Sequence, residues 1–131
     1  FLLRSTLRAV VAQRLVRVLC DGCKSTHELT EPDMVADPRY RVLGFEAGET
    51  IYRPGGCERC SGTGYRGRAG IFELLELTDD IRPLVGAEAD ASLIDRAAIR
   101  AGMTTMLDDA VQKCRLGMTA APEVLRVTSV R

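Results

Sequence analysis

The chain has 131 residues, which is enough for one small domain or two smaller pieces. Lysine and arginine together number 18, aspartate and glutamate also number 18, and the formal net charge is therefore zero. A neutral chain lacks the basic excess that nucleic acids and anionic membranes attract, and no apolar run reaches the about 18 residues of a spanning helix. We therefore expect neither a nucleic-acid partner nor direct insertion into a membrane.

Residues 1–19 are predicted to form a helix. They contain many good helix formers and neither glycine nor proline, and Leu3, Leu7, Leu15 and Val18 recur at helical spacing. Other apolar residues lie off this stripe, so the helix requires neighbours on most sides. Because the chain also starts without a methionine, we interpret this helix as the end of a larger, truncated domain. A helix at a homodimer interface is the alternative.

Four of the five cysteines form two Cys-x-x-Cys pairs, and this spacing is the strongest functional signal in the chain. Two intervening residues let both sulfurs of a pair bind one metal ion, and two pairs complete a tetrahedral zinc site with no open position. The predicted ligands are Cys20, Cys23, Cys57 and Cys60. Two disulfides are the alternative, but an odd cysteine count without a secretion signal favours a reducing, cytoplasmic compartment. A site of four cysteines also accepts iron or cadmium.

The only histidine and the fifth cysteine are expected to lie outside this site. His27 follows the first pair and is predicted to be a surface loop residue, because four cysteines already complete the coordination. Cys114 continues an apolar helical stripe and is predicted to be a buried core thiol. Four thiolates and one Zn²⁺ leave about two negative charges, which basic side chains near the ligands are expected to offset. These are Lys24, Arg59, Arg66 and Arg68.

The rest of the chain predicts an α+β fold. Residues 24–50 are predicted to form a polar, turn-rich connection with a helical turn at 33–36, and residues 61–70 a loop. Residues 50–53 are predicted to form a strand, and residues 71–77 a second strand whose Phe72, Leu74 and Leu77 face a core. Four helices follow; one ends at Val85, one runs from about residue 90 to Gly102, one from about residue 105 to Gly117, and a short one follows Thr119.

Three segments are predicted from these patterns. They are the helix of residues 1–19, a small tetracysteine zinc module with short strands at 20–68, and a strand with a C-terminal helical subdomain at 69–131.

No catalytic or nucleotide-binding residue is predicted. The stretch from Gly62 to Gly67 matches the letters Gly-x-Gly-x-x-Gly, but it follows a cysteine pair and precedes a strand, whereas a dinucleotide site needs a strand before it and a helix after it. A Gly-x-x-x-x-Gly-Lys-Ser/Thr loop does not occur in the sequence.

Three stretches of the sequence resemble the C-terminal region of type II secretion system ATPases, within the type II/IV secretion and pilus assembly ATPase family. They are residues 7–24, residues 56–75 and residues 123–128, together with Gly102-Met103. The resemblance covers nearly the whole chain. Type IV pilus assembly ATPases share the tetracysteine module, and the run from Ala12 to Arg17 favours the secretion branch.

The resemblance implies a parent protein that hydrolyses ATP as a hexameric ring. It would be peripheral to the cytoplasmic face of the inner membrane, contact inner-membrane platform proteins and drive pseudopilus assembly. ATP and Mg²⁺ would bind only in an upstream domain, so the fragment itself is expected to be structural and not an enzyme. Zinc ligation by the four paired cysteines is the property that carries over, and residues 1–19 would be the last helix of the ATPase core.

Two functions from other classes remain as alternatives. A stand-alone zinc module that binds nucleic acid is disfavoured, because residues 20–68 hold seven basic against eight acidic residues. A chaperone module is the other alternative, because residues 57–64 resemble one Cys-x-x-Cys-x-Gly-x-Gly repeat of the J-domain chaperones. Those chaperones use four such repeats.

Overall fold

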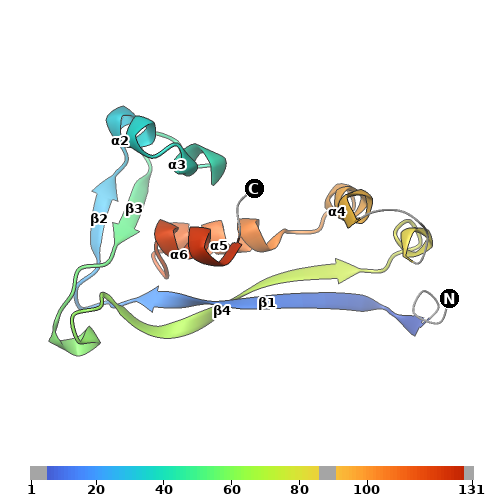
Figure 1. Cartoon of the computed structure of the whole chain (residues 1–131), viewed down its shortest axis with the longest axis horizontal. Helices are drawn as coiled ribbons and strands as arrows, with labels where there is room; N and C mark the ends of the chain where they lie inside the picture. The colour runs from blue at the N-terminus through green and yellow to red at the C-terminus, as the bar shows by residue number, and fades with distance from the viewer. Residues whose placement is uncertain (1–5, 86–90, 129–131) are drawn as a thin grey trace. The chain divides into compact units, whose positions relative to one another are not determined.

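The computed structural model describes residues 6–85 and 91–128, and it is a mixed α+β structure (Figure 1). The chain divides into two compact units. One combines the residues up to Gln13 with Phe72–Met106, and the other combines Arg14–Ile71 with the residues from Leu107 onward. The division into three segments with boundaries after residues 19 and 68, expected from the sequence, stays a prediction.

The helix predicted over residues 1–19 is wrong for most of its described part, because Ala9–Leu19 form strand β1. Residues 1–5 of that prediction lie outside the described residues. Val16 and Leu19 are buried, whereas Val11 is 63% exposed, so the apolar residues do not form the wide buried stripe of a packed helix. Valines are frequent in this segment, and β-branched residues favour extended backbone when a partner strand is present.

The partner of β1 is strand β4, Tyr65–Glu76, in a two-stranded sheet. Near one end the Cys20 amide donates to the Gly64 carbonyl at 3.0 Å, and near the other the Leu77 amide donates to the Arg8 carbonyl at 2.9 Å. Residue numbers therefore rise along β1 while they fall along the paired part of β4. The pair is antiparallel, as the arrows of Figure 1 show.

Strand β4 is longer than predicted, because its first six residues were expected to be a loop. The prediction that Phe72 and Leu74 face a core is also wrong, whereas Leu77, which was predicted with them, is buried. Ile71 is fully buried, whereas Phe72 and Leu74 are 45% and 46% exposed. Neighbouring residues of a strand point to opposite faces, so burial of Ile71 directs Phe72 the other way.

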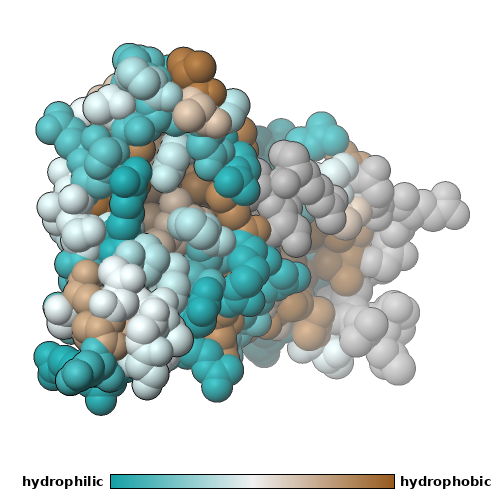
Figure 2. Space-filling view, turned by 60° about the vertical axis from the view of Figure 1, so that its left-hand side comes forward, coloured by the Kyte–Doolittle hydropathy of each residue, from teal (hydrophilic) through white to brown (hydrophobic). Residues whose placement is uncertain are grey.

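The second unit also contains a small hairpin-like pair of strands. Strands β2 (Ser25–Glu28) and β3 (Thr50–Arg53) pair antiparallel, and β3 was predicted. Helix α2 (Glu31–Ala36) covers the predicted helical turn, and helix α3 (Arg39–Val42) follows it. The surface turned toward the viewer in Figure 2 is mostly hydrophilic, and hydrophobic atoms at its top lie over α2 and α3.

A capping box starts helix α2. The Thr30 hydroxyl accepts from the Asp33 amide at 3.3 Å, and the Asp33 carboxylate accepts from the Thr30 amide at 2.9 Å. The two groups thereby satisfy two backbone donors that the first turn leaves without helical partners.

Helices α5 (Met106–Arg115) and α6 (Ala121–Thr128) follow the predicted positions. Cys114 on α5 is 1% exposed, and burial raises the pKa of its thiol to about 11, which confirms the predicted core thiol. The side chains buried in this unit include Leu29, Met34, Ile51, Ile71, Ala110, Val111 and Val124.

The first unit has a smaller core. It contains the 3-10 turn η2 (Arg82–Leu84) and helix α4 (Ala91–Arg100), both within predicted helices. Leu77, Ile81 and Ala98 are buried together, with partly buried apolar neighbours around them. No helix in residues 6–85 and 91–128 has the length and hydrophobicity needed to cross a membrane.

Candidate metal centre

The first cysteine pair forms a tight turn at the end of strand β1. Cys20 follows the strand directly, and its carbonyl accepts from the amides of Cys23 at 3.2 Å and Lys24 at 2.9 Å. These two bonds fold the chain back within four residues, so both sulfurs of the pair lie on the same side. Strand β2 then leaves the turn one residue after Lys24.

The second pair surrounds the 3-10 turn η1, Glu58–Cys60. Cys57 precedes the turn with extended backbone, and the Gly62 amide donates back to its carbonyl at 2.9 Å. Ser61 ends the turn in the left-handed conformation, with φ 56°. A non-glycine residue adopts that conformation at a cost, and the surrounding turn contacts hold it there.

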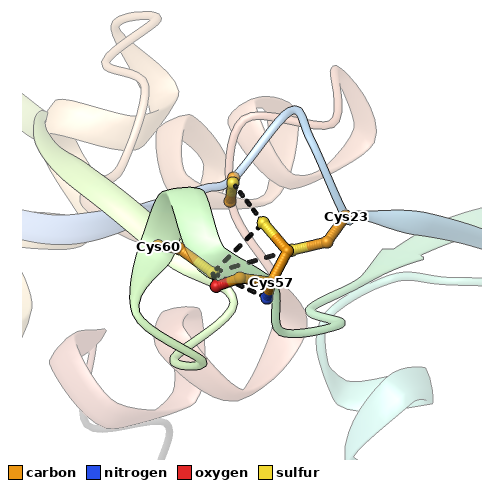
Figure 3. Close-up of side chains that lie close together, drawn as sticks. Cys23, Cys57 and Cys60 are labelled. Atoms are coloured by element: carbon orange, nitrogen blue, oxygen red, sulfur yellow. Dashed lines mark hydrogen bonds between the residues drawn. The ribbon is translucent and has the colours of Figure 1, made fainter.

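The four sulfurs form one cluster in which every pair lies within 4.8 Å (Figure 3). The sulfurs of Cys20 and Cys57, of Cys23 and Cys60, and of Cys57 and Cys60 are each 3.8 Å apart. A tetrahedron with metal–sulfur bonds of about 2.3 Å has edges of about 3.8 Å. All four are free cysteines, and their spacing therefore fits a tetrahedral zinc site.

Backbone amides are the described hydrogen-bond donors to this cluster. Gly56 donates to the Cys23 sulfur at 3.2 Å, and the amides of Cys57 and Gly64 donate to the Cys60 sulfur at 3.3 and 3.2 Å. Such bonds stabilise thiolates and offset the negative charge that four of them leave around Zn²⁺. Two of the three donors are glycines, Gly56 directly before the second cysteine pair and Gly64 four residues after it, and neither was identified as a donor from the sequence.

Two of the four basic side chains expected to fill this role, Lys24 and Arg59, have other described contacts. Lys24 Nζ donates to the Gly117 carbonyl at 3.0 Å and lies 3.1 Å from the Asp21 carboxylate. The side chain of Arg59 packs beside Gly22, where an added Cβ would lie 3.1 Å from Arg59 Cδ. An effect of these cations on the cluster would therefore act through space and not through a described hydrogen bond to sulfur.

Two of the thiols, Cys23 and Cys60, have pKa values shifted in opposite directions. The Cys57 amide, with help from Gly64, lowers the pKa of Cys60 to about 6. The Gly56 amide acts in the same direction on Cys23, but desolvation and the neighbouring thiols outweigh it and raise the pKa of Cys23 to about 11. The Cys60 thiolate therefore forms readily at neutral pH, whereas a metal ion must displace the proton of Cys23, which makes metal affinity depend on pH.

Glycines let the chain segments around the cluster approach closely. A Cβ at Gly55 would lie 2.4 Å from the Cys23 carbonyl oxygen, and a Cβ at Gly64 would lie 2.5 Å from Pro54 Cβ. Gly64 also has φ +83°. A side chain at Gly55 would press on the first cysteine turn, and one at Gly64 would press on Pro54, which leads into the second, so both glycines support the cluster although neither is a predicted ligand.

His27 lies in strand β2 and not in a loop, and it is not a member of the cluster that the described residues form. Its Nε2 is 2.8 Å from Asp33 Oδ2. This bond, together with those from Thr30, lowers the pKa of Asp33 to about 2. The histidine thus supports the start of helix α2 and not the metal site.

Comparison with known proteins identifies the family. The family described as type II/IV secretion system protein matches residues 1–126. Similar proteins include type II secretion system protein E of Dickeya dadantii, 39% identical over 128 residues, and type II secretion system ATPase E of Vibrio cholerae, 41% identical over 132 residues. The type IV pilus assembly ATPase PilB of Thermus thermophilus is 39% identical over 133 residues.

These alignments cover 98% of the chain in each case, but only 24% of each of the two secretion proteins and 14% of the pilus protein. The chain thus spans a quarter or less of the length of these relatives. Because the family match extends over nearly the whole chain, the chain belongs to the type II/IV secretion system protein family.

Proposed function

We propose that this chain is the zinc-binding C-terminal region of an ATPase that powers type II protein secretion. Its role is structural, and the ligands are Cys20, Cys23, Cys57 and Cys60. The observation that carries the proposal is the cluster of four sulfurs at tetrahedral spacing in a member of this family. Zinc would supply a cross-link there and no catalytic water, because four thiolates leave no open position.

The benefit of such a cross-link follows from the length of chain that it closes. Residues 24–56 lie between the two cysteine turns and hold only two four-residue strands and two short helices. Short elements of this kind bury little apolar surface. Structural zinc sites contribute on the order of 10–16 kcal/mol in small peptides, which is enough to order such a segment.

The activity of the parent protein is part of the same proposal. ATP and Mg²⁺ would bind in an upstream domain of the parent protein. The parent would form a hexamer peripheral to the cytoplasmic face of the inner membrane, and its partners would be platform proteins of the secretion system. Membership of the family supports this proposal. A type IV pilus assembly ATPase is the second candidate, because the Thermus pilus protein is as similar to this chain as the Dickeya secretion protein.

Elemental analysis of the purified chain tests the metal site. We expect about one zinc per chain, and loss of that zinc in Cys57→Ser and Cys60→Ser. Cys114→Ser is the matched control, because it also removes one thiol but lies outside the cluster. A folded, metal-free wild-type chain, or equal zinc in the Cys57 and Cys114 variants, would contradict the proposal.

A complementation assay tests the biological role. The gene for the full-length protein is deleted in its host and replaced with wild type, Cys57→Ser or Cys114→Ser, and export of a secreted enzyme and pilus-dependent motility are both measured. We expect the Cys57 variant to lose export with motility unchanged. Loss of motility alone would assign the chain to the pilus branch instead.

A further inference from the structure

A buried carboxylate holds two arginines in place within the second unit. Glu123 on α6 is 2% exposed. It accepts from the backbone amide, Nε and Nη2 of Arg17 at 2.8, 3.0 and 2.9 Å, and from Nε and Nη2 of Arg126 at 3.1 and 2.8 Å. Burial alone would raise the pKa of Glu123, but the hydrogen bonds from Arg126 and Arg17 hold it at about 2. The carboxylate is therefore ionised at neutral pH and fixes the direction of both guanidinium groups.

Both guanidinium groups remain available to a further anion. The side chains of Arg17 and Arg126 are 48% and 55% exposed, and the described bonds to Glu123 use only Nε and Nη2 of each. Each guanidinium group has five N–H donors, so several are left over. The Arg17 guanidinium also lies 4.2 Å from the centre of the Tyr65 ring, which restricts its motion further.

These two arginines line a hollow of ≈ 690 Å³ on the surface of the unit. The lining is completed by Thr63, Tyr65, Arg66, Gly67 and Arg68. The lining contains four arginines and no acidic residue, and together with Glu123, which binds two of these arginines, they carry a net charge of +3. Within residues 6–85 and 91–128, neither Arg66 nor Arg68 has an ion pair. The chain as a whole is neutral, so this is a local concentration of positive charge.

The backbone of β4 is irregular where it lines the hollow. A regular strand directs successive side chains to opposite faces, yet residues 65, 66 and 68 all line this hollow. Gly67 has φ +80°, which is left-handed backbone within the strand. An irregularity of this kind bends a strand and re-aims its side chains, as bulges do next to binding sites.

A second, smaller hollow continues the first. Its volume is ≈ 340 Å³, and it shares Arg66 and Gly67 with the larger one. Its other lining residues include Arg59 of the second cysteine turn and residues 18–22. One of these is acidic, Asp21, whose carboxylate is paired with Lys24 at 3.1 Å. The basic groups therefore form an elongated series from α6 along the start of β4 to the cysteine turns.

We propose that these two hollows bind an extended acidic segment of a partner protein. Guanidinium groups recognise carboxylates through paired hydrogen bonds, and arginines that are already oriented lose little conformational entropy on binding. The Tyr65 ring and the aliphatic parts of the arginines supply apolar contact for the segment between its carboxylates. This proposal rests on the hollow alone and does not depend on the proposed role in secretion.

The observations favour a polypeptide over other anions. Compact phosphate sites gather backbone amides at a helix N-terminus or a nest, whereas this lining comes from strand β4 and the side chains of Arg17 and Arg126. Membranes and nucleic acids present many charges and attract proteins with a broad basic excess, which this neutral chain lacks. An acidic segment requires only a local, elongated set of cations.

The competing explanation is that these arginines offset the negative charge of the metal cluster. It fits Arg59, which packs beside Gly22. It does not explain Arg126, which lies on α6 and is bound to Glu123, nor the absence of ion pairs at Arg68 within the described residues. The two explanations predict different results when these arginines are replaced. If they offset the charge of the metal cluster, the variant should retain less metal, whereas if they form a recognition site, metal retention should not change.

Fluorescence anisotropy of labelled peptides on the zinc-loaded chain tests the proposal. The probe is an oligoglutamate peptide, and an oligoglutamine peptide of equal length is its control. We expect binding of the acidic peptide only, weakened by added salt, and about a tenfold loss of affinity in the double variant Arg66→Ala, Arg68→Ala. The matched control is Arg53→Ala, Arg100→Ala, which removes the same charge from exposed positions outside the hollows and should bind as wild type does.

Three results would overturn the proposal. The first is equal affinity in the two double variants, and the second is loss of zinc from the Arg66, Arg68 variant, which would support charge compensation. The third is stronger binding to pyrophosphate, or to vesicles of anionic phospholipid, than to the peptide, which would identify a phosphate ligand instead. Retained zinc together with selective loss of peptide binding supports an acidic protein partner.

Discussion

Replacing Glu123 with glutamine should destabilise the chain at neutral pH and change how its stability depends on pH. The substitution keeps the size of the side chain but removes its charge. The side chain is 2% exposed and accepts five hydrogen bonds from two arginines. Without the carboxylate charge, the guanidinium groups of Arg17 and Arg126 would lie next to each other with no compensating anion.

The size of the effect follows from the ionisation of Glu123. Its pKa of about 2 lies roughly two units below the about 4.3 of an unfolded glutamate, and each unit is worth about 1.4 kcal/mol. This gives about 3 kcal/mol. The arginine partners are about half exposed and solvent screens the interaction, so we expect about 2 kcal/mol at neutral pH.

The sign of the pH dependence is also defined. Because the folded-state pKa of Glu123 lies below the unfolded value, its stabilisation is complete above about pH 4.3 and disappears as the pH falls toward about 2. The difference in unfolding free energy between wild type and Glu123→Gln should therefore shrink over that range. Other carboxylates and the cysteines titrate equally in both proteins, so they cancel in the difference.

Urea denaturation followed by circular dichroism measures this difference. It is recorded for wild type, Glu123→Gln and the control Glu28→Gln at about pH 7, 5 and 3. Glu28 is exposed and has no ion pair within the described residues, so its variant should match wild type throughout. A Glu123 variant as stable as wild type at pH 7, or a difference that stays constant down to pH 3, would refute the reasoning.

Three further substitutions or reagents test other parts of the structure. Gly64→Ala should lower the free energy of unfolding by about 3 kcal/mol and weaken zinc retention, because the added Cβ would lie 2.5 Å from Pro54 Cβ. Gly44→Ala is the control, because Gly44 also has a positive φ but open space around it, and it should lower the free energy of unfolding by only about 1 kcal/mol in urea denaturation. Asp33→Asn should lower the melting temperature by a few degrees at about pH 7 and converge with wild type as the pH falls toward about 2, because the pKa of Asp33 is about 2. Cys114 should react with iodoacetamide far more slowly at about pH 8 than a model thiol, since burial raises its pKa to about 11; rapid labelling of the folded chain would contradict its burial.

The clustering of the four paired cysteines was predictable because the pattern is local. The spacing of each cysteine pair determines which turn it can form, and two such turns imply four ligands. Helix α5 was predictable for a similar reason, because Ala110, Val111 and Cys114 recur at helical spacing and are all buried.

Strand β1 was not predictable from its own residues. Its leucines and arginines are compatible with a helix, and its strand conformation depends on pairing with β4, which lies about fifty residues away in the chain. The bond between Arg17 and Glu123 spans 106 residues and has no local signature at all. Long-range pairing of this kind overrides a helical pattern whenever the partner supplies both hydrogen bonds and burial.

The metal cluster, the paired strands and the last two helices meet around the end of β1. The Leu19 amide donates to the Met118 carbonyl at 2.8 Å, and the Thr119 hydroxyl donates to the Arg17 carbonyl at 2.8 Å. Because Cys20 follows directly, the position of the first cysteine turn is coupled through the backbone to the segment that carries Arg17.

That coupling would give a bound zinc ion an effect beyond its own ligands. The Gly64 amide donates to the Cys60 sulfur, and the Gly64 carbonyl accepts from the Cys20 amide, so this one residue joins both cysteine turns. Tyr65 and Arg66, which line the larger hollow, are the next residues along the chain. A metal that fixes the two cysteine turns therefore also fixes the start of β4, where the basic hollow is built. Zinc would thus influence recognition of an acidic partner through backbone geometry, although its cluster carries a charge of the same sign as that partner.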